Sequence, residues 1–356
     1  MDKSATSDFS DSFENNYASV FNSKEWSLDL FSFSQRALRK HETRNFEVLR
    51  ANDGTLYLQG SRDRIDTDYL QLLADEYELL YDETIKNGGR FLYVQVPYKN
   101  AGQAPELAGY TVDKTEESEN YIVHLMEEKG IPVLDLRDFS DCVEYYKTDH
   151  HWTTSAAFKA SAIIADELEK KYGINLTGHK YYGNINNYDS ITYEDSFLGS
   201  IGIKVGPYFT GKDDFTVYKP KFDTDLDFKH YIDKLDFEYY GNFWDTFFDQ
   251  GILEDSSYNN KYNANMHGAY VESIINNNAA ENDYRGLLIT HSYGRPMAQY
   301  MSLDFKELRY LDPQKGRYND NLTEYISDYQ PDIVILMYNS DINVGCEPKL
   351  RGGYSK

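Results

Sequence analysis

Short apolar runs bounded by polar turns alternate along this chain with longer segments that carry apolar residues on one helical face. The runs have the length and the β-branched and aromatic content of buried strands. They lie at residues 91–96, 132–136, 287–290, 308–311 and 332–338. The helical segments lie at residues 67–86, 117–129, 153–172 and 322–329. Strands that alternate with helices predict an α/β fold built on a mostly parallel, doubly wound sheet.

The interval 173–283 interrupts this alternation. It is rich in Tyr, Asn, Asp and Gly and contains no long amphipathic segment, so we expect loops and short strands packed on the sheet. The chain has 356 residues, enough for one large domain with an insertion. We therefore predict an N-terminal leader or arm over residues 1–55, followed by one domain over 56–356 with its insertion at about 173–283.

Composition narrows the classes of partner. The chain has 36 basic and 59 acidic residues, which give a net charge of −23. This charge argues against nucleic acid and anionic membranes as partners, because both require a basic surface. The 33 tyrosines suit a surface that stacks on sugars, or else reflect the composition of the source organism. The acidic segment 223–227 lacks EF-hand spacing, which favours a solvated surface over a calcium loop.

No metal or cofactor is expected. The two cysteines, Cys142 and Cys346, form neither a CxxC motif nor a metal-ligand spacing with the histidines, and they are either two free thiols or one disulfide. No apolar run reaches the roughly 18 residues of a membrane span. The polar, acidic first thirty residues do not have the pattern of a signal peptide.

The first candidate catalytic motif is Thr148-Asp-His-His-Trp-Thr153, where a polar loop meets the helical segment 153–172. An Asp-x-His pair on a tight turn fixes one imidazole tautomer, as the orienter and base of a nucleophilic triad do. Asp149 and His151 have this spacing. The alternative is that these polar residues only cap the helix.

Ser292 is the candidate nucleophile. It follows the apolar run 287–290, and Pro296 is suited to the first turn of a helix after it. A serine between a strand and a helix exposes its hydroxyl at the carboxyl edge of the sheet, where its own N–H can bind an oxyanion. The alternative is an ordinary helix cap, but the Asp149-x-His151 pair in another loop favours the nucleophile.

These motifs together resemble the DHHW proteins, which are similar to the SGNH-hydrolase-like domains of alginate O-acetyltransferases. The resemblance runs from about Leu56 to the C-terminus, and its further segments lie at residues 91–97, 197–202, 289–294 and 332–339. It implies an SGNH-hydrolase-like (flavodoxin-like) three-layer sandwich with a circularly permuted motif order, because Asp149 and His151 precede Ser292.

The resemblance also implies a function. Ser292 would be the nucleophile, His151 the base and Asp149 the orienter of a serine-dependent O-acetyltransferase acting on an extracellular or cell-surface polysaccharide through an acetyl-serine. A membrane-bound O-acyltransferase would deliver the acetyl group. The chain would then lie on the extracytoplasmic side, at the cell surface or in a periplasm-equivalent compartment, where a segment absent from this sequence could tether it to the membrane. The alternatives are a carbohydrate acetylesterase with the same triad, and a non-catalytic glycan-binding or assembly protein.

Four residues near these motifs are expected to bind substrate: Asn100, Trp152, Tyr293 and Arg295. Trp152 has packing beside the base as its alternative role. The second oxyanion donor is expected from the Gly199 or Gly202 region, or from the side chain of Asn100 or Arg295. Related turns carry Asp before the serine, whereas this chain has His291. This departure introduces a second imidazole beside Ser292, although adjacent side chains on an extended strand point apart.

Overall fold

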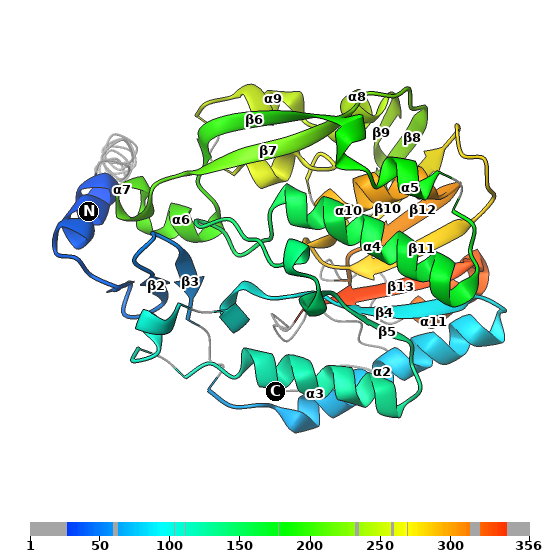
Figure 1. Cartoon of the computed structure of the whole chain (residues 1–356), viewed down its shortest axis with the longest axis horizontal. Helices are drawn as coiled ribbons and strands as arrows, with labels where there is room; N and C mark the ends of the chain where they lie inside the picture. The colour runs from blue at the N-terminus through cyan, green and yellow to red at the C-terminus, as the bar shows by residue number, and fades with distance from the viewer. Residues whose placement is uncertain are drawn as a thin grey trace, which may run out of the picture.

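The structure is a computed structural model. It describes residues 27–59, 63–102, 104–110, 112–176, 178–231, 235–257, 260–268, 270–313 and 321–339. Figure 1 shows a central sheet with helices on both sides. This arrangement confirms the predicted α/β sandwich.

Five parallel strands form the half of the sheet that was predicted from the sequence. Their bounds are β4 (Arg90–Gln95), β5 (Val133–Asp135), β11 (Arg285–Thr290), β12 (Glu307–Leu311) and β13 (Ile333–Tyr338). They are ordered β5-β4-β13-β11-β12, and each neighbouring pair is parallel. The last of them in the chain, β13, therefore lies between the first, β4, and β11.

Helices cover both faces of this sheet (Figure 1). Alternate strand residues face the two layers. In β4, Leu92 and Val94 face one layer, and Phe91 and Tyr93 face the other. The first layer contains α4 (Thr154–Tyr172) and α10 (Gly294–Met301). The second contains α2 (Thr67–Lys86), α3 (Thr115–Glu128) and α11 (Leu322–Tyr329).

Helix α4 begins directly after the Asp-His-His-Trp sequence and thereby fixes the position of that motif. Thr153 is the N-cap, and its hydroxyl accepts a hydrogen bond from the amide of Ala156. Gly173 ends the helix at a φ of 64°, which a residue without a side chain adopts readily. The helix buries its small and aliphatic stripe, including Ala156, Ala160 and Ile164, against the sheet.

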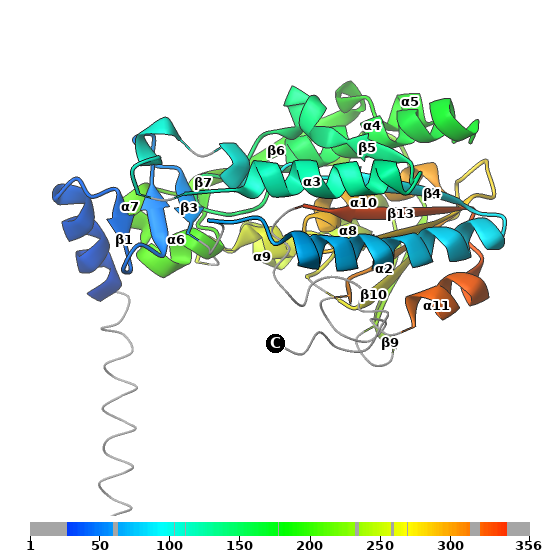
Figure 2. The same cartoon turned by 90° about the horizontal axis from the view of Figure 1, so that it is seen from below.

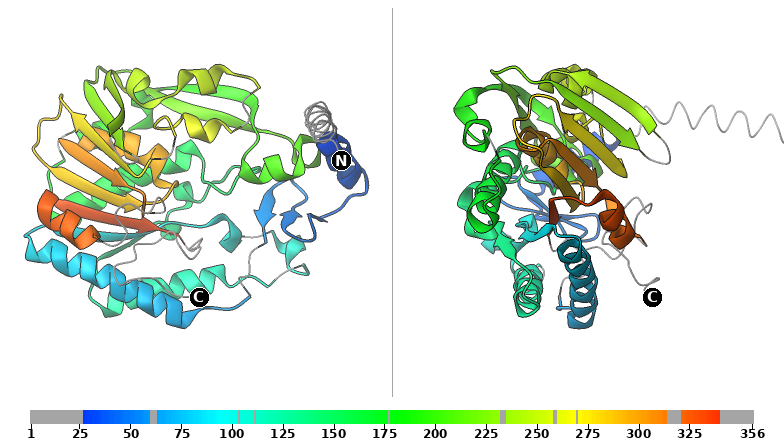
Figure 3. Two further views of the ribbon diagram at one scale, coloured as in Figure 1. Left: turned by 180° about the vertical axis from the view of Figure 1, so that it is seen from behind. Right: turned by 90° about the vertical axis from the view of Figure 1, so that its right-hand side faces the viewer.

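Residues 173–283 continue the sheet as well as packing on it. Strands β8 (Leu226–Tyr231), β9 (Leu235–Gly241) and β10 (Glu272–Asn277) extend it beyond β12 in antiparallel pairs (Figure 3). Strands β6 (Tyr188–Phe197) and β7 (Asp213–Pro220) form a separate antiparallel ribbon. The short helices of this interval are α5 (His179–Tyr182), α6 (Ser200–Val205), α7 (Pro207–Thr210), α8 (Phe243–Phe247) and α9 (Gln250–Glu254).

The N-terminal part packs at one end of the molecule. Residues 27–37 are helical, and β1 (Glu42–Thr43), β2 (Val48–Arg50) and β3 (Leu56–Leu58) form a small antiparallel sheet. This sheet lies beside α6 and α7 (Figure 2), with Val48 and Leu56 in one apolar cluster with Ile201, Val205 and Phe209. The predicted leader thus includes packed residues, while its first 26 residues lie outside the described part.

Two further expectations concern the cysteines and membrane spans. Cys142 is fully buried, and burial raises the pKa of its thiol to about 12. Cys346 lies outside the described residues, so two free thiols and one disulfide both remain open for this pair.

Among the helices of the described ranges, none has the length and apolar character needed to cross a bilayer.

Candidate active site

Ser292 lies in the turn between a buried strand and a helix. Strand β11 ends at Thr290 and α10 begins at Gly294. A Cβ on Gly294 would lie 2.3 Å from Cγ2 of Thr290, so only glycine permits so tight a turn. The amide N–H of Ser292 has no hydrogen-bond acceptor among the described residues. It is therefore available to a ligand at the start of α10.

The structure brings Asp149, His151 and Ser292 together. Nε2 of His151 lies 2.8 Å from Oγ of Ser292, and Nδ1 of the same ring lies 2.5 Å from Oδ1 of Asp149. Both contacts are within hydrogen-bond distance. Two residues of one loop and a serine 141 positions after His151 thus form one continuous chain from carboxylate to imidazole to hydroxyl, the arrangement of a nucleophilic triad.

The Asp149 carboxylate is fixed by the polypeptide around it. Its Oδ1 also accepts the His151 amide at 2.9 Å, and its Oδ2 accepts the Ser200 amide at 2.5 Å. Burial opposes the charge, but the adjacent imidazoles of His150 and His151 and these hydrogen bonds hold the pKa of Asp149 well below its usual range. Asp149 is therefore an ionised acceptor for the Nδ1–H of His151.

Gly199 makes the hydrogen bond between the Ser200 amide and the Asp149 carboxylate sterically feasible. A Cβ on Gly199 would lie 2.3 Å from the Cβ of Asp149. No pair of carbon atoms tolerates such an approach, so the loop before α6 can donate to the Asp149 carboxylate only with glycine at this position.

The imidazole of His151 contacts two other rings. Tyr262, from the 3-10 turn η6 (Lys261–Ala264), stacks on it at a centroid distance of 3.9 Å and a 16° angle. The ring of His150 is tilted by 36° to it, with its centroid also at 3.9 Å. Burial, and next the neighbouring His150, lower the pKa of His151, while Asp149 acts in the opposite direction. The ring is therefore neutral at neutral pH and can accept a proton at Nε2.

Tyr262 also contacts the nucleophile's backbone. Its hydroxyl donates to the carbonyl oxygen of Ser292 at 3.0 Å, and the residue is 1% exposed. No sequence signal pointed to Tyr262, because it lies in the irregular interval that was predicted only as an insertion.

His291 does not act as a second base in this arrangement. Its Nε2 lies 3.1 Å from Oδ1 of Asn339, which follows β13, and its Nδ1 accepts the amide of Tyr293 at 3.4 Å. The ring is thus turned toward the neighbouring strand and the turn itself. The expectation that adjacent side chains at this point diverge agrees with these contacts, and His291 supplies the acceptor that braces the turn.

Trp152 and Tyr293 occupy positions different from those expected of substrate-binding residues. Trp152 is 0% exposed, and its indole N–H donates to the carbonyl of Tyr293 at 3.0 Å. Tyr293 is 1% exposed, and its hydroxyl donates to the carbonyl of His150. With no accessible face, both side chains join the two motifs by packing. This corrects the expectation that they contact substrate, and Trp152 takes the packing role given as its alternative.

Most candidates for the second oxyanion donor are already engaged. The amides of Gly199 and Gly202 donate to the side chain and the carbonyl of Thr148, each at 2.8 Å. The amide group of Asn100 donates to the carbonyl of Leu58 at 2.7 Å. The structure therefore argues against the two glycine amides as oxyanion donors. The side chain of Asn100 binds β3 and not the triad.

Arg295 differs from these candidates. It is 5% exposed, and its Nε has no hydrogen-bond partner among the described residues. Its guanidinium lies 4.9 Å over the ring of Tyr262, the residue that stacks on His151, and Nη1 lies 3.4 Å from Oδ1 of Asn263. An unpartnered buried donor costs free energy, so Arg295 retains the capacity to bind an oxygen atom.

A buried lysine, not singled out in the sequence, organises the Asp-His-His loop. Lys99 follows β4 in the turn η1 (Lys99–Gly102) and is 3% exposed. Its Nζ donates to the carbonyls of Tyr146, Lys147 and Asp149 at 2.7, 3.0 and 2.8 Å. All three hydrogens of the ammonium group are thereby used. Its place shortly after a buried strand, which ends at Gln95, was the one available sequence signal.

The charge of Lys99 depends on its surroundings. Burial lowers the pKa of Lys99 to about 7. The charges of Asp149, Asp213 and Asp53 act in the opposite direction, and the ring of Tyr57 lies 5.5 Å from Nζ. The protonated form, present at lower pH, is the one that can donate to all three carbonyls.

Replacing Lys99 with methionine is expected to lower the rate of ester hydrolysis about 10- to 100-fold, because the loop that carries Asp149 loses three hydrogen bonds. In the unmodified protein, activity should fall as the pH rises through about 7, since the neutral amine has only two hydrogens for three carbonyls. Rates with p-nitrophenyl acetate across pH measure both effects. The exposed Lys147→Met is the control; an unchanged alkaline decrease in Lys99→Met would contradict this role.

Among the residues that the structure describes, two groups of side chains have the proximity that metal ligation needs. Asp149, His150 and His151 form one, and Asp166, Glu169 and His179 form the other. In the first, the groups already bind one another and the hydroxyl of Ser292. In the second, Lys180 pairs with Asp166. The contacts in both groups thus have explanations within the protein.

The parallel sheet and its two helical layers form an α/β fold of the SGNH-hydrolase-like type. Residues 50–187 match the sequence model of a family described as "SGNH hydrolase-like domain, acetyltransferase AlgX". The resemblance predicted from the motifs is therefore confirmed. The matched range contains Asp149 and His151 and ends before Ser292. No curated protein sequence matches the chain.

Solved structures share the fold at low sequence identity. The structure of Bacillus cereus PatB1 with a sulfonyl adduct is 16% identical, with a TM-score of 0.65 over 86% of this chain and 95% of that one. A DHHW family protein from Eubacterium siraeum is 18% identical, with a TM-score of 0.59 over 82% of this chain and 89% of that one. In each comparison the similarity covers more than four fifths of both chains.

Proposed function

We propose that this chain is a serine-dependent O-acetyltransferase that acetylates a polysaccharide through an acetyl-serine at Ser292. The observation that carries the proposal is the continuous contact from Asp149 through His151 to Ser292, with distances of 2.5 and 2.8 Å. The match of residues 50–187 to an acetyltransferase-type SGNH-hydrolase-like domain supports the acyl-transfer class.

In the first half of the reaction, Oγ of Ser292 attacks the carbonyl carbon of an acetyl ester while its proton passes to Nε2 of His151. Asp149 stabilises the resulting imidazolium through Nδ1–H. When the tetrahedral intermediate collapses, the bond to the leaving oxygen breaks and that oxygen takes the proton from His151. An acetyl-serine remains.

The negative oxygen of the intermediate requires donors. The unpartnered amide of Ser292 at the start of α10 is one. For the second we propose Arg295, which lies on the first turn of the same helix and keeps an unpartnered Nε–H. Both donors are fixed before the reaction, the condition under which such groups stabilise a transition state most strongly.

Replacing Arg295 with methionine is expected to lower kcat for p-nitrophenyl acetate about 10²-fold, the usual effect of removing one oxyanion donor. Arg309→Met is the matched control, because Arg309 also lies over a tyrosine ring, 3.7 Å from Tyr329, but on β12. If both variants lose activity equally, the effect of Arg295 is a general one on stability.

In the second half, a hydroxyl group attacks the acetyl carbon of the acetyl-serine and gives its proton to His151, which returns it to Oγ of Ser292. If the attacking hydroxyl belongs to a sugar, the enzyme is a transferase. If it belongs to water, the enzyme is an acetylesterase. We favour the transferase because of the family match. A non-catalytic glycan-binding role is the remaining alternative, and it predicts that Ser292 never carries an acetyl group.

We further propose that the protein works outside the cytoplasm. In this proposal a membrane-bound O-acyltransferase supplies the acetyl group and the acceptor is an extracellular or cell-surface polysaccharide. The net charge of −23 favours a neutral or basic glycan over a polyanion, since like charges repel.

The proposal is tested by intact-mass measurement after incubation with p-nitrophenyl acetate. We expect one added acetyl group, located at Ser292 by peptide mapping and absent from Ser292→Ala. Adding a glycan acceptor should then remove the group and yield acetylated sugar. Absence of any acetyl adduct together with absence of p-nitrophenol release would overturn the enzymatic assignment, and release to water alone would make the protein an esterase.

A further inference from the structure

His150 is the more exposed of the two neighbouring imidazoles. Tyr262, which is 1% exposed, stacks on the His151 ring. His150 also contacts that ring, with centroids 3.9 Å apart, and its side chain is 24% exposed, compared with 7% for that of His151. A ligand from solvent therefore has better access to His150 than to the base.

The His150 ring is held in a definite orientation. Its Nδ1 lies 2.9 Å from Oγ of Ser200 and 3.5 Å from Oδ1 of Asp149. Its carbonyl oxygen accepts the hydroxyl of Tyr293. Because the proximal nitrogen is engaged on one side, the distal nitrogen has a fixed direction.

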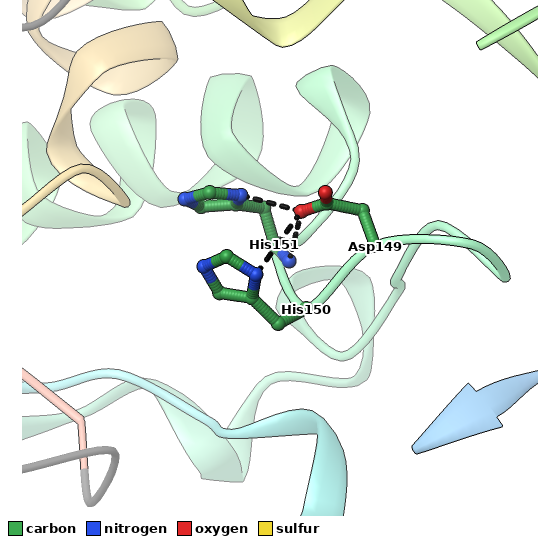
Figure 4. Close-up of side chains that lie close together, drawn as sticks. All are labelled: Asp149, His150 and His151. Carbon is green, nitrogen blue, oxygen red and sulfur yellow. Dashed lines mark hydrogen bonds and ion pairs between the residues drawn. The ribbon is translucent and has the colours of Figure 1, made fainter. Parts of the chain in front are cut away.

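That direction is shared with His151. Figure 4 shows that both rings turn their distal nitrogens to the same side, away from Asp149. The Nε2 of His151 contacts Ser292, while the Nε2 of His150 has no hydrogen-bond partner among the described residues. The site thus presents two neighbouring Nε2 atoms on one side, and the chemistry assigned so far uses one.

We propose that Nε2 of His150 binds a second hydroxyl group of the acceptor, next to the hydroxyl that attacks the acetyl-serine. The inference rests on the proposed function and names its acceptor class, a sugar with hydroxyl groups on adjacent carbons. The attacking hydroxyl contacts His151, and its neighbour contacts His150. With ring centroids 3.9 Å apart, the two imidazoles suit two adjacent hydroxyls.

This arrangement distinguishes a sugar from water. In the transfer step the attacking oxygen bonds to the acetyl carbon, its proton goes to His151, and the bond to Oγ of Ser292 breaks. His150 exchanges no proton and only positions the acceptor through its neighbouring hydroxyl. A water molecule has no neighbouring hydroxyl and gains nothing from this contact, so His150 favours transfer over hydrolysis.

The test measures how the acetyl-serine divides between sugar and water. With p-nitrophenyl acetate as donor, the native protein should transfer to a methyl glycoside with adjacent hydroxyls about tenfold better than to the matching deoxy glycoside, the effect of one hydrogen bond. In His150→Phe, which keeps a ring against His151, this preference should disappear. The ratio of transfer to hydrolysis should also fall about tenfold.

The ratio is independent of how fast the acetyl-serine forms, and the comparison of two acceptors with the native protein needs no variant. Equal transfer to both acceptors by the native protein would overturn the inference, as would an unchanged preference in His150→Phe. Either result leaves the acetyl-serine at Ser292 intact as evidence for the proposed function. Failure to form any acetyl-serine would instead overturn both.

Discussion

Replacement of Ser292 by alanine is expected to reduce hydrolysis of p-nitrophenyl acetate by roughly 10³- to 10⁶-fold, the range found when a serine nucleophile is removed. The reason is the 2.8 Å contact between Oγ of Ser292 and Nε2 of His151. Without the hydroxyl, the base has no proton to accept and no covalent intermediate forms. The measurement is the steady-state rate of p-nitrophenol release.

The control for this prediction is Ser302→Ala. Ser302 lies just beyond the other end of α10, is 1% exposed, and donates to the carbonyl of Gln299. Its loss tests whether removing a buried serine near this helix is enough to abolish activity. If Ser292→Ala keeps more than about a tenth of the rate while remaining folded, another group is the nucleophile.

Asp149→Asn is expected to lower kcat by about 10⁴-fold, the effect of a wrong imidazole tautomer in a triad. The two oxygens of Asp149 accept three hydrogen bonds, two from His151 and one from the Ser200 amide. An asparagine has one oxygen. If that oxygen binds Ser200, the NH₂ group faces Nδ1 of His151, which must then be an acceptor. The proton moves to Nε2, where it prevents abstraction from Ser292.

The kcat of the variant is measured with p-nitrophenyl acetate, and thermal unfolding shows whether it folds. Asp141→Asn makes the same chemical change at an exposed position in the preceding 3-10 turn and should not alter kcat. A loss below about tenfold in folded Asp149→Asn would mean that Asp149 does not set the tautomer of His151.

Sequence patterns predicted the elements that obey a strong local rule. The 3.6-residue stripe gave α2 and α11 with their observed bounds, and α4 within one residue. The five apolar runs became the parallel strands, because strands buried on both faces have continuous apolar sequences. Asp149, His151 and Ser292 could be found because each adjoins the end of such an element, where parallel sheets place their sites.

Other features depend on contacts that no local pattern contains. Strands β8 to β10 join the edge of the sheet at β12. The sequence of an antiparallel strand does not determine the strand with which it pairs. Lys99 and Tyr262 reach the site only through tertiary packing. Trp152 and Tyr293 were expected to face substrate because they adjoin the motifs, yet adjacency in sequence says nothing about which side chain is turned into the core.

His291 illustrates a replacement that the sequence alone could not resolve. The resemblance implied an aspartate at this position, whose carboxylate could accept backbone hydrogen bonds. Here Nδ1 of the imidazole accepts the amide of Tyr293. A neutral imidazole has one acceptor nitrogen and one donor nitrogen, and the donor can bind Oδ1 of Asn339 at 3.1 Å. The turn is thus braced without a second buried negative charge near Asp149.

The position of β13 has a consequence for folding during synthesis on the ribosome. The pair β4–β5 and the pair β11–β12 share no hydrogen bonds with each other and are joined through β13, which is synthesised after all four. The loop with His151 and the turn with Ser292 are therefore held in register by a strand that emerges late. A nascent chain lacking β13 has no strand to join these two pairs, so the central sheet is completed only after nearly all of the chain has been synthesised.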